Sequence, residues 1–379
     1  MKIAAAHCWL FPGWALEVFK DLLQQEVKND PKAEIKIFTM IADKDLKYLM
    51  IQIPWTEKYR KIQVVESLPK WLSKIFLFCT KKHIPVLSWI FDYRNLIVFY
   101  PEVMRILSRK IKRFWPERIV ISSYAIAKNV KIPQTCKHTK LYLHSPMQYI
   151  WSHREEYIWK FKWWKKKLFT SIIPRLQKRD KQFTKFDEVI FNSNYTALLA
   201  KEIYWIKWKV KYPKIKDCFY FSTPSNEIQN YFVCVGRVVN FVREVWLIIK
   251  ACNGTKTNLL IIGSWPDELK LKALAWDTII FLWWLPQEES LKIIRNAKGL
   301  INLTKESFWM WTAEALLLWV PVIWYAEWWT KELVDENGWI LIDKKNISKL
   351  KDAICTLESK DWDRRLISDS IREKLNEYS

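Results

Sequence analysis

The sequence predicts an α/β protein built from two doubly wound, Rossmann-like domains. Short, nearly continuous apolar runs alternate with longer helical patterns along the 379 residues. Such runs are typical of parallel strands buried on both faces, and their alternation with helices favours doubly wound sheets. The strands form two series, separated near residues 211–230 by a stretch rich in proline and turn formers. Two domains of ordinary size fit this length.

The elements follow in order along the chain. The first series of strands is predicted at residues 2–8, 34–38, 62–66, 118–124, 140–145 and 188–193. The second series is predicted at residues 231–236, 258–263, 278–282, 299–303, 321–325 and 339–343, with helices between them, for example at 286–297 and 312–319. The resulting organisation is an N-terminal domain (1–215), a C-terminal domain (216–345) and polar C-terminal helices (346–379), which we expect to cross back to the N-terminal domain.

The composition is unusual because the chain has 25 Trp and only 6 Gly. A soluble protein contains roughly 7% Gly. The surplus Trp stands at loop tips, at helix starts and before strands, where glycine is expected because a bulky side chain disfavours positive φ. This pattern favours the hypothesis that many of these Trp are glycines in the natural protein, encoded by UGA. Trp151 and Trp284 are expected to be genuine.

The net charge of +22 limits the class of partner to nucleic acid, an anionic membrane surface or a phosphorylated substrate. Lysines alternate with aromatic residues in the segment 160–181, which favours an anionic membrane surface, although a solvated helix face gives the same pattern. The sequence shows no signal-peptide pattern, no apolar run long enough to span a membrane and no paired-cysteine motif. We therefore expect a cytoplasmic protein, peripheral on the inner face of the plasma membrane.

The strongest candidate site is the loop between Glu306 and Glu314, ESFWMWTAE. It follows a predicted strand and opens a helix, whose free N–H groups and positive dipole end suit a phosphate. Glu314 is suited to accept hydrogen bonds from ribose hydroxyls, and Glu306 from a sugar hydroxyl. The loop residues between them complete the candidate donor site: Ser307, Phe308, Trp309, Met310, Trp311 and Thr312. Two ordinary acidic residues beside a helix are the simpler alternative.

Five segments of the second half, in order, resemble the nucleotide-sugar domain of glycosyltransferase family 4. They are a glycine–arginine strand exit at 235–246, IIGSWPDEL, the FLWW segment, the two glutamates seven residues apart, and EALLLWVPVIWYAEWWTKELV. Tryptophan occupies the family's glycine positions at 265, 283, 309, 319, 328 and 329. The resemblance covers about residues 2–343 and implies the GT-B arrangement of two domains facing across a cleft. It also implies that Gly236 and Gly263 belong to the donor site.

The first half resembles the same family more loosely. Gly13 and Trp14, in FPGWALEVF, match the glycine-rich loop that faces the acceptor and the donor phosphates. His144, in LHSPMQYIW, matches the histidine segment of the branch that includes O-antigen mannosyltransferases. The resemblance implies that His144 contacts the donor sugar or the reacting centre, while packing is the simpler alternative. His7, in the first strand, is a weaker candidate.

Two arginines are candidates for stabilising the leaving diphosphate. Arg237 follows Gly236 at a strand exit, and Arg243 stands near the position where the family has a second cation. Guanidinium groups bind phosphate oxygens in pairs. The two D-x-D sequences lie in a polar early loop (43–45) and in the C-terminal tail (361–363), and neither follows a strand in a nucleotide-binding context. We therefore expect a metal-independent reaction with no cofactor other than the sugar donor.

The resemblance implies a retaining glycosyltransferase. It would move a sugar, mannose from GDP-mannose by the branch resemblance, to a lipid-linked or cell-surface glycan. Two alternatives stay open at this point. A non-transferase GT-B enzyme, such as a nucleotide-sugar epimerase, would share the fold, and a basic nucleic-acid-binding protein would share the charge, although the sequence contains no recognisable nucleic-acid-reading module.

Overall fold

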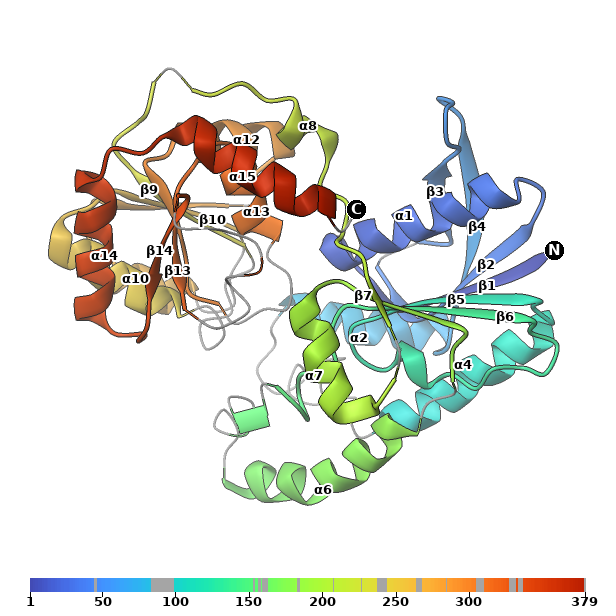
Figure 1. Cartoon of the computed structure of the whole chain (residues 1–379). Coiled ribbons are helices and arrows are strands. Elements are labelled where there is room, and N and C mark those ends of the chain that lie inside the picture. Colours follow the sequence, from blue (N-terminus) through green and yellow to red (C-terminus); the bar gives the residue numbers. More distant parts are fainter. Residues whose placement is uncertain are drawn as a thin grey trace. The chain divides into compact units, whose positions relative to one another are not determined.

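The structure is a computed structural model that describes residues 1–43, 46–82, 99–152, 154–155, 158, 163–182, 185–206, 208–225, 227–236, 244–263, 268–283, 285–304, 310–326, 332 and 337–377. The chain divides into two compact units, Met1–Lys211 and Tyr212–Ser379, each built around its own sheet (Figure 1). Each unit is described below by itself.

Unit 1 contains an eight-stranded sheet in the order β3-β4-β2-β1-β5-β6-β7-β8. All neighbouring strands are parallel except β3 and β4, which form an antiparallel hairpin. The order reverses between β1 and β5, so the switch point of the sheet lies there. The strand bounds are β1 Lys2–Leu10, β2 Glu34–Ala42, β3 Tyr48–Gln52, β4 Tyr59–Glu66, β5 Arg118–Ser123, β6 His138–Leu143, β7 Glu188–Phe191 and β8 Lys209–Val210.

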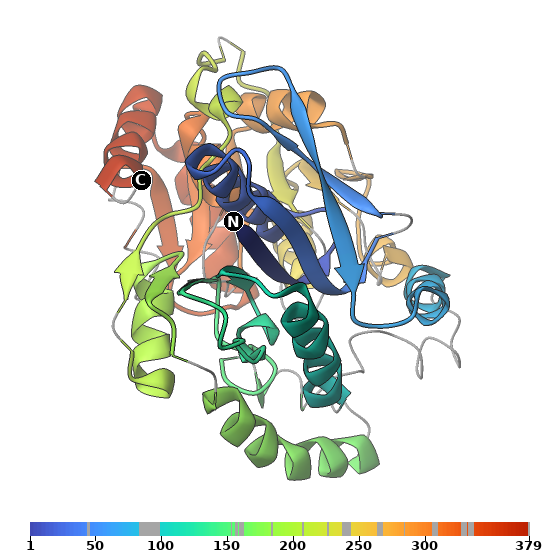
Figure 2. The same ribbon diagram turned by 90° about the vertical axis from the view of Figure 1, so that its right-hand side faces the viewer.

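Helices cover both faces of this sheet. Alternate residues of β1 face opposite ways: Ile3 and Ala5 belong to the core beneath α1, whereas Ala4 and Ala6 belong to the core that includes α4 and α6. Figure 2 shows α1 and α4 on the two sides of the strands. The helices of unit 1 with described bounds are α1 Trp14–Asn29, α2 Lys70–Lys82, α4 Tyr100–Phe114, α6 Trp163–Lys181 and α7 Asn194–Tyr204, with a 3-10 turn, η2, at Ala127–Asn129.

Unit 2 contains a six-stranded, wholly parallel sheet in the order β11-β10-β9-β12-β13-β14. This is the strand order of a doubly wound dinucleotide-binding fold, with the switch point between β9 and β12. The strand bounds are β9 Phe232–Val235, β10 Leu259–Ile262, β11 Ile279–Leu282, β12 Gly299–Asn302, β13 Val322–Tyr325 and β14 Trp339–Ile342.

The helices of unit 2 pack in two groups. Helix α10 packs against α14, and α13 packs against α15. The C-terminal helices therefore pack within unit 2, and the expectation that they cross back to the other unit stays a prediction, as do the expected domain boundaries. The helix bounds are α8 Asp217–Tyr220, α10 Val245–Thr255, α11 Glu268–Lys272, α12 Gln287–Asn296, α13 Met310–Leu317, α14 Ile347–Ser359 and α15 Arg364–Glu377.

Tryptophan occupies most of the left-handed backbone positions taken by residues other than glycine. Among the described residues, six such positions have positive φ: Trp55, Trp115, Trp205, Glu244, Lys256 and Trp319. Only a few per cent of non-glycine residues adopt positive φ, and bulky ones do so rarely. Four tryptophans in this set of six are therefore a structural anomaly that matches the compositional one.

Each of these four tryptophans takes a place that glycine normally occupies. Trp55 follows Pro54 in the β3–β4 turn, closed by the Thr56 amide donating to the Ile53 carbonyl at 3.2 Å; a type II turn places glycine after proline. Trp115 and Trp205 end α4 and α7 with left-handed φ. The amides of Trp319 and Val320 donate to the carbonyls of Leu316 and Ala315, which is the Schellman end of a helix.

The predicted fold class is confirmed. Every predicted strand is present, with ends shifted by a few residues at most. The structure adds two strands that were not predicted, β3 as the antiparallel partner of β4 and the short β8 beside β7. No helix in the described ranges is both long and apolar enough to cross a membrane.

Candidate functional site

In unit 1, the loop after β1 contains the glycine that begins α1. Gly13 has φ of 151°, which favours glycine, and its carbonyl accepts from the amides of Leu16 and Glu17 at 3.0 and 3.2 Å. Trp14 is the first residue of the helix and is half-buried. The loop thus leaves the carboxyl end of β1, next to the switch point of the sheet, as the sequence analysis expects of a ligand-facing loop.

His144 lies near the same switch point and belongs to a chain of three buried polar side chains. It directly follows β6, and its Nε2 atom lies 2.8 Å from Oγ of Ser122 in β5. The same Oγ lies 3.1 Å from Nδ1 of His7 in β1, and the Ser122 carbonyl lies 3.1 Å from that nitrogen. The structure thus joins the two predicted histidines through a serine that the sequence analysis did not single out.

Both histidines are neutral at physiological pH. Burial lowers the pKa of His144 to about 3, and the neighbouring His7 adds to this effect. Burial also lowers the pKa of His7 to about 4, although its hydrogen bond to the Ser122 carbonyl opposes the shift. His7 stacks on Phe19 of α1, with ring centroids 4.8 Å apart. The chemistry available to these rings is that of neutral hydrogen-bonding groups.

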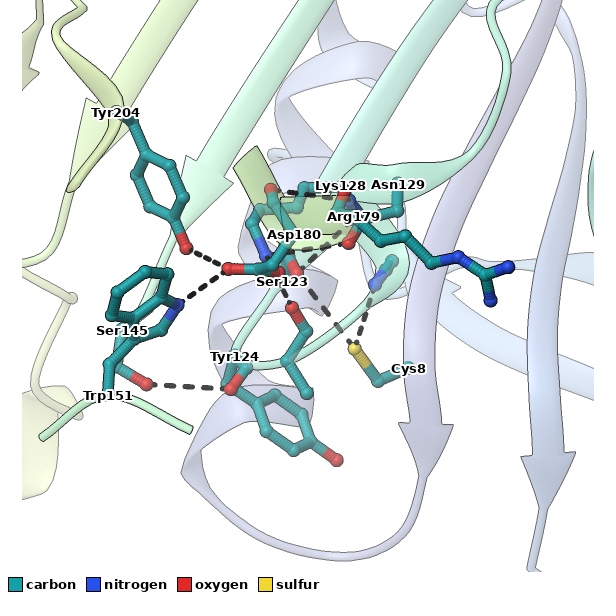
Figure 3. Close-up of polar contacts among 12 residues, drawn as sticks. Cys8, Ser123, Tyr124, Lys128, Asn129, Ser145, Trp151, Arg179, Asp180 and Tyr204 are labelled. Carbon is teal, nitrogen blue, oxygen red and sulfur yellow. Dashed lines mark hydrogen bonds and ion pairs between the residues drawn. The ribbon is translucent and has the colours of Figure 1, made fainter. Parts of the chain in front are cut away.

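A buried ion pair holds the segment that follows His144 (Figure 3). Lys128 in η2 pairs with one carboxylate oxygen of Asp180 in α6, and both side chains are buried. The second oxygen accepts hydrogen bonds from Nε1 of Trp151, at 2.9 Å, and from the Tyr204 hydroxyl. Opposite charge and two further donors thus satisfy Asp180. The pair anchors α6 to the carboxyl edge of the sheet, where the 144–151 segment lies.

In unit 2, the two predicted donor-site glycines touch each other at the carboxyl ends of adjacent strands. Gly236 directly follows β9 and Gly263 directly follows β10, with φ of 130° and 138°. A Cβ atom built on Gly263 would lie 2.1 Å from the Gly236 carbonyl oxygen. A residue with a side chain does not fit at position 263, so the backbones after β9 and β10 can approach each other closely there.

Glu314 is the most unusual ionisable group in unit 2. It lies in α13, after β12, and its exposed fraction is 0%. Neither carboxylate oxygen has a hydrogen-bond partner among the described residues. Burial raises the pKa of Glu314 well above its ordinary value, and Lys216 opposes the shift only partly. A buried carboxyl without partners costs stability, which points to a role that a ligand completes.

The start of α13 is held by neighbours of Glu314. The Asn302 amide, at the end of β12, donates to the Thr312 hydroxyl at 3.1 Å, and the Thr304 amide and hydroxyl both donate to the Asn302 side-chain oxygen. Met310 and Thr312 are buried, and Trp311 is half-buried. Asn302 is a further polar group that the sequence analysis missed, because an asparagine at the end of a strand gives no distinctive pattern.

Several predicted site residues lie outside the described part of the chain. They are Glu306, Ser307, Phe308, Trp309, Arg237 and Arg243. Their assigned roles stay predictions. Among the described residues, no three histidine, cysteine, aspartate or glutamate side chains are grouped so as to hold a metal ion. The metal-independent reaction also stays a prediction.

Residues 217–378 match the family model described as glycosyl transferases group 1. No curated protein matches the chain by sequence. Solved structures resemble it along its whole length. Sucrose-phosphate synthase from Thermosynechococcus elongatus has 13% identity and a TM-score of 0.68, with 100% of this chain and 94% of that chain covered.

Two further solved structures show the same architecture. WaaG, a glycosyltransferase involved in lipopolysaccharide biosynthesis, has 13% identity and a TM-score of 0.67 over 99% of this chain and 95% of its own. Anabaena HepE, solved with UDP-glucose, has 14% identity and a TM-score of 0.62 over 100% and 96%. The fold of this chain is therefore GT-B. The match of residues 217–378 to the glycosyl transferases group 1 model supports a glycosyltransferase.

Proposed function

We propose that this chain is a retaining, metal-independent hexosyltransferase that uses a nucleotide-diphosphate sugar. The observation that carries the proposal is Glu314, a buried carboxyl in the helix after β12 that has no hydrogen-bond partner among the described residues. Two adjacent hydroxyl donors, such as those of a ribose, would satisfy both oxygens at once. The contact between Gly236 and Gly263 leaves room for a phosphate-bearing ligand to approach the same edge.

In this proposal each unit has a separate task. Unit 2 binds the nucleotide through Glu314 and its glycines, and Glu306 holds the sugar. Arg237 and Arg243 neutralise the departing diphosphate, so no metal is needed. Unit 1 binds the acceptor near the Gly13 loop, and His144 hydrogen-bonds the transferred sugar. GDP-mannose is the proposed donor, and a lipid-linked or cell-surface glycan is the proposed acceptor.

The test begins with donor binding. The purified full chain is titrated by calorimetry with UDP- and GDP-sugars, including GDP-mannose and UDP-glucose, without added metal and with EDTA. We expect saturable binding of at least one donor. Nuclear magnetic resonance of the glycoside then gives the anomeric configuration, which retention requires to match the donor. Absence of binding to every donor would contradict the proposal, and a free epimerised sugar nucleotide would favour the epimerase alternative.

The basic helix α6 supports a peripheral membrane location for the acceptor. Its exposed cations are Lys166, Lys167, Arg175, Lys178, Arg179 and Lys181. Such a surface attracts anionic lipid by about 1 kcal/mol per basic residue near the membrane. Co-sedimentation with vesicles that contain or lack phosphatidylglycerol tests this location. We expect binding only to the anionic vesicles, weakened in the charge-reversed Arg175→Glu/Lys178→Glu chain; equal recovery with both vesicles contradicts the location.

The four left-handed tryptophans support the proposal that many Trp in this sequence are UGA-encoded glycines in the natural protein. Glycine would remove the steric cost of positive φ at Trp55, Trp115, Trp205 and Trp319. Trp151 differs, because its indole N–H donates to Asp180 and glycine has no such donor. Peptide mass spectrometry of the natural protein should read glycine at the first four positions and tryptophan at 151. Tryptophan masses at the four positions contradict the proposal.

A further inference from the structure

The Ser122 hydroxyl lies within hydrogen-bond distance of both buried histidines of unit 1. It pairs with His7 in the β1–β5 register, so the two side chains emerge side by side. Its Oγ atom lies 3.1 Å from His7 Nδ1 and 2.8 Å from His144 Nε2. All three side chains are buried, so water does not compete for these contacts. The positions of the protons in this chain are therefore set by the protein.

The Ser122 carbonyl fixes the direction of the first hydrogen bond. A carbonyl oxygen only accepts, and it lies 3.1 Å from His7 Nδ1, so Nδ1 carries the proton. In the opposite tautomer the lone pair of Nδ1 would face the carbonyl oxygen. The proton on Nε2 of His7 would also be buried with no acceptor, because this atom has no partner among the described residues. The Nδ1–H form of His7 is the favoured one.

The second hydrogen bond follows from the first. The Ser122 hydroxyl oxygen is approached by the Nδ1–H group of His7, so its own proton is free to point to Nε2 of His144. A neutral imidazole that accepts at Nε2 carries its proton on Nδ1. Nδ1 of His144 has no hydrogen-bond partner in the described ranges of the chain. It is the nitrogen left to face a ligand.

We propose that Ser122 is a positioning residue that holds His144 in the Nδ1–H tautomer, so that the ring offers a hydrogen-bond donor, and not a base, to the transferred sugar. This inference rests on the proposed sugar-contacting role of His144. A neutral donor suits glycosyl transfer, because the anomeric centre gains positive charge in the transition state and an imidazolium would oppose it. The sugar atom recognised is a hydroxyl oxygen.

The tautomer can be measured directly. The full chain, labelled with ¹⁵N in its five histidines, is studied by long-range proton–nitrogen correlation near pH 7. We expect His144 to show a protonated Nδ1 and an unprotonated Nε2, with the signals assigned by His7→Gln and His144→Gln. In Ser122→Ala we expect His144 to lose this single tautomer. Ser122→Thr keeps the hydroxyl and should retain it.

The rate of sugar transfer tests whether the tautomer of His144 matters for activity. We expect kcat/KM to fall about tenfold in Ser122→Ala, the effect of losing one well-placed hydrogen bond, and to recover in Ser122→Thr. Ser123→Ala is the matched control, because the Ser123 hydroxyl contacts Cys8 and the Lys128 amide and neither histidine. It should leave both the tautomer and the rate unchanged.

The two hypotheses fail in different ways. A protonated Nε2 on His144 in the unaltered chain would overturn the positioning role. This measurement does not depend on whether any variant folds. A shifted tautomer in Ser122→Ala with an unchanged transfer rate also overturns it. The proposed function fails instead if the unaltered chain binds no nucleotide sugar while His144 still shows the expected tautomer.

Discussion

The switch points of the two sheets differ in how their polar groups are satisfied. In unit 1, His7, Ser122 and His144 bind one another, and Asp180 has three partners nearby. In unit 2, Glu314 is equally buried and its two oxygens have no partner among the described residues. The difference teaches that the polar groups of unit 1 are satisfied within the unit, and it leads to the prediction that a ligand satisfies Glu314 in unit 2. Four predictions test this contrast.

The largest effect is expected at the internally satisfied site. Asp180→Asn leaves the Lys128 ammonium buried without a counterion, which should lower the free energy of unfolding by about 3–5 kcal/mol. Urea denaturation measures this loss. The exposed pair of Glu102 and Arg105 is the control, and Glu102→Gln should cost less than about 1 kcal/mol. If Asp180→Asn unfolds like the unaltered chain, unit 1 is not organised by this pair.

The second prediction concerns Glu314. In Glu314→Gln the affinity for the nucleotide sugar should fall by roughly 100-fold, because hydrogen bonds to a charged group contribute about 1.5–3 kcal/mol each. Calorimetric titration measures the change, with Glu289→Gln on the exposed surface of α12 as control. The same substitution should raise Tm in the absence of ligand, by about 2–4 °C per kcal/mol gained.

The increase in stability expected for Glu314→Gln should depend on pH. Burial raises the pKa of Glu314 in the folded chain, so the unfolded chain releases this proton at lower pH. Stability is therefore lost as pH rises above about 4.5, and Glu314→Gln should lack this loss. Comparing Tm of the two chains at pH 5 and pH 8 tests the sign. A variant that is less stable than the unaltered chain at pH 8 would show that Glu314 is satisfied without ligand.

The third prediction uses the buried histidines of unit 1. The pKa of His7 is about 4 in the folded chain, against 6.5 when unfolded, so the unfolded chain binds the proton first as pH falls. The free energy of unfolding should therefore decrease by about 2–3 kcal/mol as the pH falls from 7 to 4.5. His7→Gln should reduce this dependence, whereas the half-buried His138→Gln serves as control. Equal pH dependence in all three chains contradicts a neutral, buried His7.

The smallest effect is expected at the exposed tryptophans. Trp55 and Trp205 are 90% and 84% exposed, so replacing them removes little packing. Trp55→Gly and Trp205→Gly should each stabilise a chain made with literal tryptophan by about 1 kcal/mol, because positive φ costs 1–2 kcal/mol for a side-chain-bearing residue. Trp151→Gly should destabilise it, since Asp180 loses a donor. The melting temperatures of the three variants test these expectations. A lower melting temperature for Trp55→Gly and Trp205→Gly would contradict the proposal that positive φ at these positions is costly for tryptophan.

The sequence was sufficient for the fold because the apolar runs are short and bounded by polar residues. Each strand of unit 2, from Phe232–Val235 to Trp339–Ile342, lies within a predicted run. The strand Tyr48–Gln52 was missed because it alternates in exposure at the edge of the sheet and has no continuous apolar run. An edge strand of this kind is hard to predict without knowing the strand that it pairs with. The hairpin turn also has Trp55 at a position where a glycine would have indicated a turn.

The candidate site was predicted less completely than the fold. His144, Gly236 and Gly263 were selected by family resemblance, and the structure places each directly after a strand, at the carboxyl edge of its own sheet. Glu314 was selected from its place in a helix after a predicted strand, and it lies in α13, which follows β12. Ser122 was not selected, because a serine in a strand is common and its neighbours in space are not its neighbours in sequence. His7 and Ser122 meet only through the β1–β5 register, across 115 residues. Contacts between residues so far apart in the sequence depend on the order of strands in the sheet, which a local sequence pattern does not give.

The left-handed turn at Trp55 has a consequence for the gene as well as for the backbone. If that residue is a glycine encoded by UGA, a cell with the standard code would stop translation at Pro54 or earlier. The product would extend no further than β3 and would lack β5, so neither the switch point nor the partner of His7 could form. The chain would thus be made only by cells that share its codon assignment, and a small feature of turn geometry would restrict the exchange of this gene between organisms.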